Sequence, residues 1–290
     1  MASMRIDLHT HTTASDGLLA PAALVAEAAR WGVGLLAVSD HDTTAGVDPA
    51  ASAGEASGVE VWPAVELSCD VEDGEVHMLG YFVDHHLGWF QALLERLRDG
   101  RARRARRMVE RLAALGVPVD YARVEALAGG GAIGRPHIAR ALVEAGHTRT
   151  VAEAFERYIG RSGPAYVERL KVTPAQAVQV IRAAGGLAVL AHPGWGQQEA
   201  LIPELVAQGL DGIEVYYPDH SPDQVERYAA LARRHGLLIT GGTDFHGGGL
   251  ATGVGVGSQY VPEAVVVPLR EAAAARRPQD RAPDLALAGT

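Results

Sequence analysis

The chain of 290 residues contains a single cysteine, Cys69. One cysteine cannot form an internal disulfide, and it excludes zinc or iron–sulfur sites built from several cysteines. This cysteine usage is typical of a reducing compartment. The sequence also has no run of about 18 apolar residues that could span a bilayer, and its N-terminus lacks the apolar core of a signal peptide. We therefore expect a cytoplasmic protein with no membrane partner.

Positive charge is outweighed by negative charge, because 26 Lys and Arg residues stand against 35 Asp and Glu residues, a net charge of −9. This balance excludes a protein that coats nucleic acid by its overall charge, although a local basic patch can still steer a phosphate substrate. One predicted helix carries such a patch, made of Arg98, Arg101, Arg103, Arg104, Arg106, Arg107 and Arg111. Two interpretations stay open: a solvated helix face, or a surface that attracts an anionic substrate.

Short apolar runs rich in Val, Ile and Leu alternate with longer stretches of helical period, which is typical of βα units around a mostly parallel sheet or barrel. Seven strands are predicted, at Arg5–Leu8, Gly34–Asp40, Val59–Glu66, His77–Val83, Leu187–Ala191, Gly212–Tyr217 and Leu237–Gly241. Helices are predicted near Pro21–Trp31, Thr173–Ala184, Leu201–Gln208 and Pro222–His235. The fold class is therefore α/β.

The predicted strands fall into two groups, separated by a long segment, Gly88 to Lys171, that contains no convincing strand and reads as several helices. We interpret residues 1–87 and 172–275 as one catalytic barrel and residues 88–171 as an inserted helical subdomain. Residues 276–290 contain two prolines and few large apolar side chains, so we expect a disordered tail.

Histidine is the residue type whose excess carries information, with 12 in the chain, and imidazole is the commonest metal ligand. His9 and His11 follow the first predicted strand, and their spacing points both rings to one side, as two ligands of one ion require. Other acidic and imidazole residues near strand ends are Asp16, His41, Glu66, His77, His192, Asp244 and His246. In a parallel barrel such positions converge at one mouth. His77 begins its strand, which indicates that this strand runs against the others.

These nine residues comprise six imidazoles and three carboxylates. They exceed the three or four ligands that one tetrahedral zinc takes, so more than one ion is predicted. Imidazole and carboxylate without thiolate suit Mn²⁺, Fe²⁺ or Zn²⁺, and affinity order does not choose among them. Each residue taken singly could be a cap, a surface group or a satisfied core residue, but the joint pattern argues against that interpretation.

The same residues carry a family resemblance. The motifs are Asp7-Leu8-His9-Thr10-His11, Ser39-Asp40-His41-Asp42, Glu66, His77, Ala191-His192-Pro193 and Thr243-Asp244-Phe245-His246. They resemble those of the PHP (polymerase and histidinol phosphatase) family of metal-dependent phosphoesterases. The segments 133–142 and 214–217 resemble the subgroup of small nucleotide phosphatases and a related 5′-to-3′ exoribonuclease. The resemblance implies a distorted, TIM-like (β/α)7 barrel with a trinuclear metal site at its mouth.

The resemblance also implies which residues hold the ions. One ion would be held by His9, His11, Glu66 and Asp244, a second by Asp16, His41 and His246, and a third by Glu66, His77 and His192. Glu66 would bridge two ions, which the two oxygens of a carboxylate allow. Some family members have histidine in place of Asp16, a difference that can alter metal preference. We expect two or three divalent ions, with Mn²⁺ first and Fe²⁺ or Zn²⁺ as alternatives.

The implied chemistry is attack on phosphorus by a hydroxide that bridges the ions, since bound metals lower the pKa of water from 15.7 towards about 7. Arg135 and His137 would bind the phosphate, because an arginine fork matches two phosphate oxygens. The alternative is that both residues simply start a helix after the glycine-rich turn 129–131. His220 is predicted either to reach the substrate or to belong to a helix start.

Two interpretations stay open for the two aspartates that flank His41. Asp40 and Asp42 are expected either to orient imidazoles from behind or to form a turn. The general acid is not assigned by the sequence.

The leading prediction is a phosphatase acting on nucleotides such as 5′-AMP or 3′,5′-bisphosphates. A 5′-3′ exoribonuclease on short 5′-phosphorylated RNA is the main alternative, with the arginine-rich helix guiding the backbone. The segment 88–171 offers few aromatic platforms for single-stranded RNA, namely Trp89, Phe90, Tyr121, Phe155, Tyr158 and Tyr166. Histidinol phosphate is a less favoured substrate. The full ligand set argues against a non-catalytic PHP module, and an amidohydrolase is disfavoured because Lys171 is the only lysine.

Overall fold

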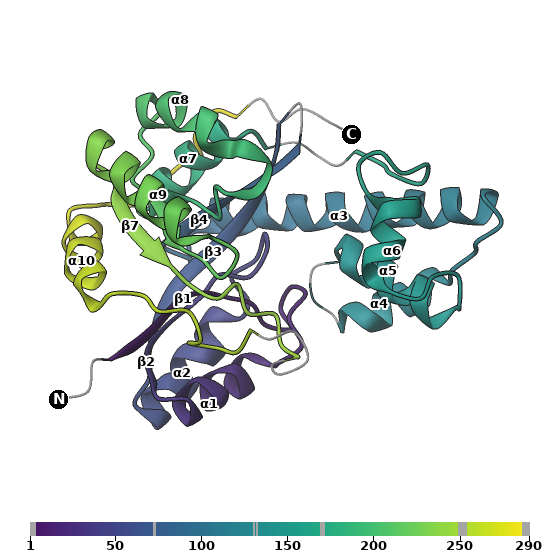
Figure 1. Cartoon of the computed structure of the whole chain (residues 1–290), viewed down its shortest axis with the longest axis horizontal. Helices are drawn as coiled ribbons and strands as arrows, with labels where there is room; N and C mark the ends of the chain where they lie inside the picture. Colours follow the sequence, from purple (N-terminus) through teal and green to yellow (C-terminus); the bar gives the residue numbers. More distant parts are fainter. Residues whose placement is uncertain are drawn as a thin grey trace.

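Seven strands form one sheet in the computed structural model, which describes residues 4–71, 74–129, 131, 133–168, 172–248 and 254–285 (Figure 1). The strands follow one another in chain order as β1 (Arg5–Thr10), β2 (Val33–Val38), β3 (Glu60–Val71), β4 (Gly74–Tyr81), β5 (Leu187–Leu190), β6 (Gly212–Tyr216) and β7 (Leu238–Gly241). The prediction of seven strands in an α/β fold is therefore confirmed.

One strand, β4, runs against the other six. It pairs antiparallel with both β3 and β5, whereas all other neighbouring pairs are parallel. The beginning of β4 therefore lies at the same edge of the sheet as the ends of its neighbours. This reversal confirms the direction predicted from His77, and it brings that residue to the edge where the other candidate ligands lie.

The sheet curves strongly but is not closed by a strand ladder. Tyr81 on β4 donates a hydrogen bond of 2.8 Å to the carbonyl of Leu8 on β1, across the inner face. The edges β1 and β7 approach through an isolated bridge between Thr10 and Phe245, where the His11 amide donates to the Phe245 carbonyl over 2.9 Å. The expected closed barrel is thus not confirmed, and the structure supports a curved seven-stranded α/β sheet.

Helices cover the outer face of the sheet (Figure 1). They are α1 (Pro21–Arg30), α2 (Val47–Ser57), α7 (Pro174–Ala183), α8 (Ile202–Ala207) and α9 (Pro222–His235), with the short turn η2 (Trp195–Leu201). The turn η4 (Glu263–Val265) and helix α10 (Val266–Ala274) follow β7 and pack against the inner face. The predicted caps of α7 and α9 are present, since Thr173 and Ser221 each accept a hydrogen bond from the amide three residues later. Helix α2 was not predicted.

The core lies on both faces of the sheet. On the outer face, apolar residues of β3 to β6 pack against α7, α8, α9 and the start of α3 (Gly88–Ala114). On the inner face, residues from β1 to β5 form one cluster that α10 covers. Because side chains alternate along a strand, burial of both faces explains the nearly continuous apolar runs in the sequence.

Between β4 and α7 the described residues form helices and no strand. Helix α3 extends away from the sheet and packs with α4 (Tyr121–Ala128), α5 (Arg135–Glu144), α6 (Val151–Ala154) and the turn η1 (Phe155–Ile159) (Figure 1). These elements bury a separate apolar cluster that includes Met108, Leu112, Ile138 and Leu142. Lys171, the only lysine, lies outside the described residues.

The described part of the tail runs back along the sheet domain. The Gln279 amide donates a 2.8 Å hydrogen bond to the carbonyl of Ala183, and Trp89 Nε1 donates one of 2.9 Å to the carbonyl of Gln279. Leu285 packs against the outer core. Across the whole described chain, we find no helix that combines the length and the apolar character needed to cross a membrane.

Candidate metal centre

The histidine pair of the first strand faces the inside of the curved sheet. His9 and His11 have no exposed surface, and their ring centroids are 5.2 Å apart. Because side chains alternate along a strand, two residues at this spacing project to the same side. The pair thus forms one wall of a buried polar site at the end of β1.

Four side chains meet next to this wall. One ligand atom from each of His9, His11, Glu66 and Asp244 lies within 4.8 Å of the others. The Nε2 atoms of His9 and His11 lie 3.3 and 3.1 Å from Glu66 Oε2, and 3.3 and 3.0 Å from Asp244 Oδ1. Two imidazoles and two carboxylates at such distances are a suitable donor set for one divalent ion. The cluster has the same four members that the family resemblance implies for its first ion.

Two further clusters adjoin the first. His11, Asp16, His41 and His246 form one, and His41, Glu66 and His77 form the other. The other carboxylate oxygen of this residue, Glu66 Oε1, lies 2.8 Å from His77 Nδ1 and 3.3 Å from His192 Nε2. The structure therefore brings all nine predicted side chains into one connected site, with Glu66 contacting five of the histidines and with Asp16 and His246 joined to them through His11 and His41.

Several donor atoms of this site are buried without hydrogen bonds. Within the described residues, His9 Nε2, both ring nitrogens of His11, Asp16 Oδ1, Glu66 Oε2, His192 Nδ1 and Asp244 Oδ1 have no hydrogen-bond partner. A buried polar atom that lacks a partner is costly, and several such atoms converging on one space are hard to explain as a stable core. Divalent ions would satisfy them, so the residues present fit a metal centre.

A buried acid, Glu214 on β6, holds two of the ligands from behind. His9 Nδ1 lies 3.0 Å from Glu214 Oε1, and the His192 amide donates to Glu214 Oε2 over 2.8 Å. A proton held on Nδ1 leaves the Nε2 lone pair of His9 free to face the cluster. No role was predicted for Glu214, although a carboxylate within a buried apolar strand is itself an unusual sequence feature.

Backbone strain is concentrated at the site. Asp42, His192 and Asp244 have φ angles of 51°, 27° and 52°, in the region that favours glycine. Residues other than glycine adopt these angles at an energetic cost, and they persist where function fixes the backbone. The strained residues include two of the nine candidate ligands.

Charges at the centre perturb its histidines in opposite directions. Burial alone would lower the pKa of His77, but the Glu66 carboxylate raises it to about 10. Asp16 and Asp244 likewise overcome burial at His246, whose pKa rises to about 10. His41 is lowered to about 3, since burial there outweighs the attraction of Glu66 and Asp16. The apo centre thus holds protons on some ligands and not on others.

The chain resembles proteins of known activity. No family model matches it. The 5′-3′ exoribonuclease Rnm of Escherichia coli is 40% identical over 247 residues, which cover 83% of this chain and 84% of that protein. A 3′,5′-nucleoside bisphosphate phosphatase of Chromobacterium violaceum is 37% identical over 250 residues, covering 84% and 88%. A crystal structure from Bifidobacterium adolescentis, described as a metal-dependent phosphoesterase, matches with a TM-score of 0.84 and 34% identity over 93% of this chain and 96% of that one.

The chain belongs to the PHP family of metal-dependent phosphoesterases. This phosphoesterase is therefore a hydrolase that acts on phosphate esters.

In the phosphoesterase, Asp40 holds a loop and not an imidazole. Its carboxylate accepts hydrogen bonds from the Thr12 amide and hydroxyl, both 2.7 Å long, and from the Ser15 hydroxyl, 2.6 Å long. Because these residues lie between His11 and Asp16, Asp40 positions both candidate ligands through the backbone. Of the two predicted interpretations, the geometry favours fixing a turn.

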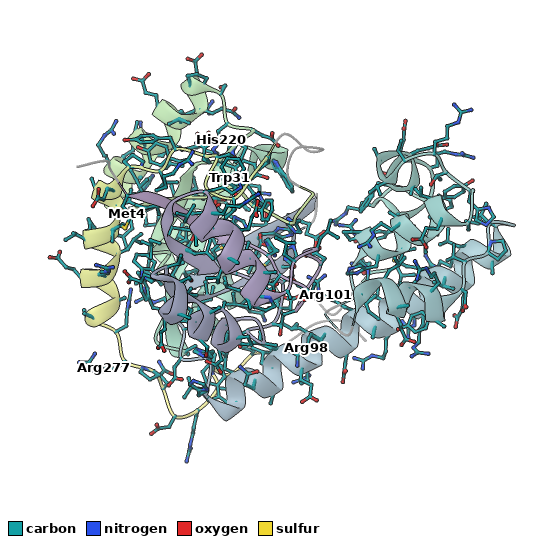
Figure 2. All side chains as sticks on the ribbon, turned by 90° about the horizontal axis from the view of Figure 1, so that it is seen from below. Met4, Trp31, Arg98, Arg101, His220 and Arg277 are labelled. Carbon is teal, nitrogen blue, oxygen red and sulfur yellow. The ribbon has the colours of Figure 1, made fainter. Side chains whose placement is uncertain are left out.

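Asp42 links the sheet of the phosphoesterase to α3. It accepts a 2.6 Å hydrogen bond from Arg101 Nε and one of 3.1 Å from the Ser68 amide. Arg101 also donates to the Ser68 hydroxyl over 2.6 Å. Figure 2 labels Arg98 and Arg101 where α3 leaves the sheet, between the two parts of the molecule. The sequence offered no signal that singled Arg101 out among seven clustered arginines.

Arg135 and His137 lie at the start of α5. Arg135 pairs with Glu75, whose carboxylate is also 3.7 Å from His77 Nε2, so the guanidinium sits beside the metal centre. His137 is buried, and its Nδ1 accepts a 3.0 Å hydrogen bond from the Gly134 amide. That bond is a helix cap, the alternative interpretation for His137.

His220 makes contacts with backbone on both ring nitrogens. Nδ1 lies 2.9 Å from the Val215 carbonyl, and Nε2 accepts a 3.3 Å hydrogen bond from the Gly194 amide. Because its polar atoms are engaged, the ring is placed to fix the loop after His192, and substrate contact by this side chain is not part of the geometry.

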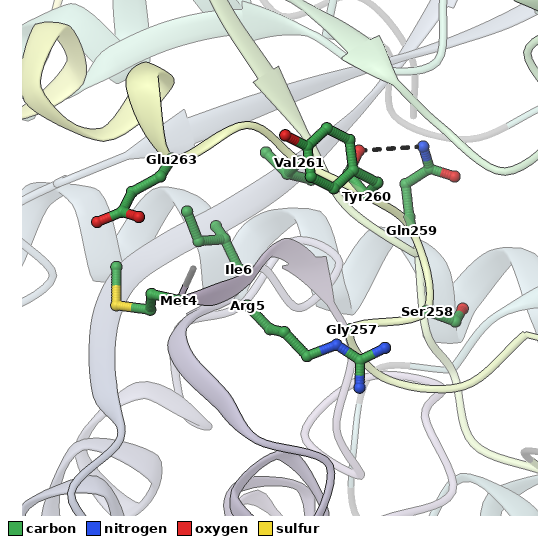
Figure 3. Close-up of a pocket in the computed structure, with 9 residues that line it drawn as sticks. All are labelled: Met4, Arg5, Ile6, Gly257, Ser258, Gln259, Tyr260, Val261 and Glu263. Atoms are coloured by element: carbon green, nitrogen blue, oxygen red, sulfur yellow. Dashed lines mark hydrogen bonds between the residues drawn. The ribbon is translucent and has the colours of Figure 1, made fainter. Parts of the chain in front are cut away.

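Two hollows of the phosphoesterase differ in their relation to the centre. One lies beside the metal ligands and is lined by Tyr217, Asp219, Asp244, Phe245 and His246 among others. The other, shown in Figure 3, is lined by residues at the beginning of β1 and by the segment 257–263. The beginning of β1 is the edge opposite the candidate ligands, so of these two hollows only the first lies at the metal centre.

Tyr217 forms part of the wall of that first hollow. Its hydroxyl donates a 3.2 Å hydrogen bond to Asp244 Oδ2, and burial raises its pKa, which keeps the phenol protonated. The bond occupies one oxygen of Asp244 and leaves Oδ1 facing the histidine pair. Tyr217, like Glu214, lies in the segment 214–217 that resembles the family, but the sequence assigned no role to either residue.

Proposed function

We propose that this phosphoesterase removes phosphate from phosphomonoesters of nucleotides, such as 5′-AMP or 3′,5′-bisphosphates. The observation that carries the proposal is the set of three adjoining donor clusters, two of which share Glu66, with several buried donor atoms that have no hydrogen-bond partner. The bisphosphate phosphatase relative supports the substrate class.

We infer two or three divalent ions, with Mn²⁺ preferred and Fe²⁺ or Zn²⁺ as alternatives. The first would be held by His9, His11, Glu66 and Asp244, the second by Asp16, His41 and His246, and the third by Glu66, His77 and His192. In this structure His41 also lies within reach of the third cluster, and His11 within reach of the second. When bound, such ions supply a nucleophile from water at neutral pH and neutralise charge on phosphate oxygens.

The chain's own residues prepare the centre for that chemistry. Glu214 fixes the tautomer of His9, Tyr217 orients Asp244, and Asp40 fixes the loop between His11 and Asp16. Such preorganisation means that little rearrangement is needed when charge develops on the phosphate.

Arg135 is our candidate for a direct phosphate contact. It lies beside the third cluster, paired with Glu75, and an incoming phosphate would compete with that carboxylate for the guanidinium. We expect R135A to keep its metals and to lose roughly 10- to 100-fold in kcat/KM, the value of a charge-assisted hydrogen bond. Steady-state kinetics and metal analysis would check this, with R140A on the same helix as the control. Loss of metal, or unchanged kinetics, would argue against the phosphate contact.

A 5′-3′ exoribonuclease is the second candidate, because the Escherichia coli relative carries that name. The aromatic rings after residue 88 favour the smaller substrate. Phe90 is buried, and the rings of Tyr121, Phe155, Tyr158 and Tyr166 each lie against an arginine. They are therefore not arranged as a free platform for successive bases.

The contacts of the arginines on α3 also favour the smaller substrate. Arg104 and Arg111 donate to the carbonyls of Val167 and Tyr166, and Arg106 pairs with Glu125. Much of the basic patch thus holds the helical part together, which favours neither a free solvated face nor a continuous track for an RNA backbone.

The two functions can be separated in one experiment. Mn²⁺-loaded protein is incubated in parallel with adenosine 3′,5′-bisphosphate and a 5′-phosphorylated RNA trimer, and the products are resolved by chromatography. Orthophosphate from the bisphosphate with the trimer intact supports the proposal. Mononucleotides released from the trimer would replace it with the exoribonuclease.

A further inference from the structure

An exposed indole stands beside the metal centre. Trp31, Trp195 and Tyr260 are the exposed aromatic residues of the described chain, and Trp195 is 44% exposed. Its ring centroid lies 4.3 Å from that of His192 and 6.1 Å from that of Tyr217. By contrast, Trp31 ends α1 next to Arg30, and Tyr260 lines the hollow at the opposite edge of the sheet (Figure 3).

The turn that carries this indole is fixed. The Trp195 amide donates a 3.1 Å hydrogen bond to the His192 carbonyl, and His220 accepts one from the Gly194 amide. A Cβ atom at Gly194 would lie 2.9 Å from His220 Cδ2, so the ring packs directly against the glycine backbone. Further along η2, Gln198 Nε2 donates a 3.1 Å hydrogen bond to the Glu75 carbonyl on β4. These contacts explain why His220 is buried next to the site without facing it.

A rigid, half-exposed aromatic ring next to a phosphate-binding centre is suited to one kind of partner. The base of a nucleotide presents a planar π-face, and stacking on an aromatic ring tolerates any base. A large apolar surface in this position would otherwise be left in water, whereas the surrounding ligands are polar.

We propose that Trp195 stacks on the base of the nucleotide substrate. This contact makes the enzyme select nucleotides over phosphate esters that carry no aromatic base. The inference rests on the proposed function. It assigns His220 as a positioning residue, which acts on the substrate only through the turn that holds Trp195. It also predicts that the four bases are accepted with similar efficiency, because no base edge is read.

The test compares two substrates with the same scissile ester, 5′-AMP and ribose 5-phosphate, in the Mn²⁺-loaded enzyme. Wild type should prefer 5′-AMP. The variant W195L keeps apolar cover over His192 but has no ring, and it should lose about 5- to 100-fold of that preference, mainly through KM. W195F should retain most of it. W31A, which changes the exposed tryptophan at the end of α1, is the matched control and should behave as wild type.

The outcomes separate this inference from the proposed function. If wild type hydrolyses neither 5′-AMP nor the bisphosphate, the proposed function fails. If wild type hydrolyses nucleotides but cleaves ribose 5-phosphate equally well, or if W195L keeps the wild-type preference, only the role of Trp195 is overturned. An equal loss on both substrates, with reduced metal content, would also overturn it, because the indole would then be supporting His192.

Discussion

At the scale of single residues, the centre depends on acidic side chains that contact the candidate ligands without being candidate ligands themselves. Glu214 is the clearest case, since one carboxylate engages His9 through its ring and His192 through its amide. Interactions of this kind set the tautomer and the angle of an imidazole ligand, and their loss weakens metal binding even when every ligand remains.

We therefore expect E214Q to bind Mn²⁺ about 10- to 100-fold more weakly than wild type while keeping its fold. The amide has nearly the shape of the carboxylate, but it is uncharged and has only one acceptor oxygen. It therefore cannot accept hydrogen bonds from both the His9 ring and the His192 amide. Titration of chelator-treated protein with Mn²⁺ measures the change, and E226Q on the exposed face of α9 is the control. Unaltered affinity in E214Q would show that His9 is held by other means.

Proton release is a second prediction at this scale. With pKa values raised to about 10, His77 and His246 are protonated at pH 7 in the apo protein. Metal ligation needs neutral imidazole, so binding must displace these protons, and apparent affinity must rise with pH until the pKa is passed. Calorimetry in buffers of different ionisation enthalpy should detect net proton release when the protein is loaded with metal at pH 7. Binding without proton release would contradict the assignment of these two ligands.

At the scale of elements, the single ion pair between Arg101 and Asp42 joins α3 to the sheet at the centre. The exposed fraction of the Asp42 side chain is 2%, so removal of Arg101 would leave a buried carboxylate without its guanidinium, although the Ser68 amide would still donate to it. We expect R101A to lower the free energy of unfolding by about 3 kcal/mol and to reduce activity, since Asp42 follows His41. R103A, exposed on the same helix, should change stability by less than about 0.5 kcal/mol. Chemical denaturation followed by circular dichroism measures both, and equal effects would argue against a specific link.

The sequence was informative about elements wherever apolar periodicity was strong. All seven strands could be predicted, because their buried faces leave runs of Val, Ile and Leu. The reversed direction of β4 could be predicted from His77, which stands at the beginning of its strand and not at its end. Helix α2 was missed because Pro49 and Gly54 lie inside it and both are poor helix formers. The extension of β3 to Val71 was missed because it pairs only with the reversed strand.

The site residues also fall into those that the sequence could single out and those that it could not. The nine candidate ligands could be singled out because their residue types are rare in strands and their positions follow the strand ends, and their role as metal ligands stays a prediction. Arg101 and Glu214 could not, because their roles depend on the distant elements that they contact, β3 and β1. Trp195 could not, because the exposure of its ring depends on how the loop after β5 folds. Such contacts leave no periodic pattern in the chain.

At the scale of the whole molecule, the centre is a source of stability only when ions are bound. Ligands that bind the folded state alone stabilise it by mass action, by about 2.7 kcal/mol at one hundred times the dissociation constant. Mn²⁺ added to chelator-treated protein should therefore raise the thermal midpoint in a concentration-dependent way. D244N should lose most of this shift, whereas D219N should retain it. A constant midpoint in wild type would favour a module that binds no metal.

The same arrangement has a consequence for how the protein is made. The Asp7 carboxylate accepts hydrogen bonds from the Thr243 amide and hydroxyl and from the Gly257 amide, and His11 and Asp244 share one cluster. A chain emerging from the ribosome displays its first two histidines long before it displays the acid that completes their site. The helices between residues 88 and 168 can pack in the meantime, because they have their own apolar cluster. Metal loading of this cluster must therefore wait until Asp244 has left the ribosome.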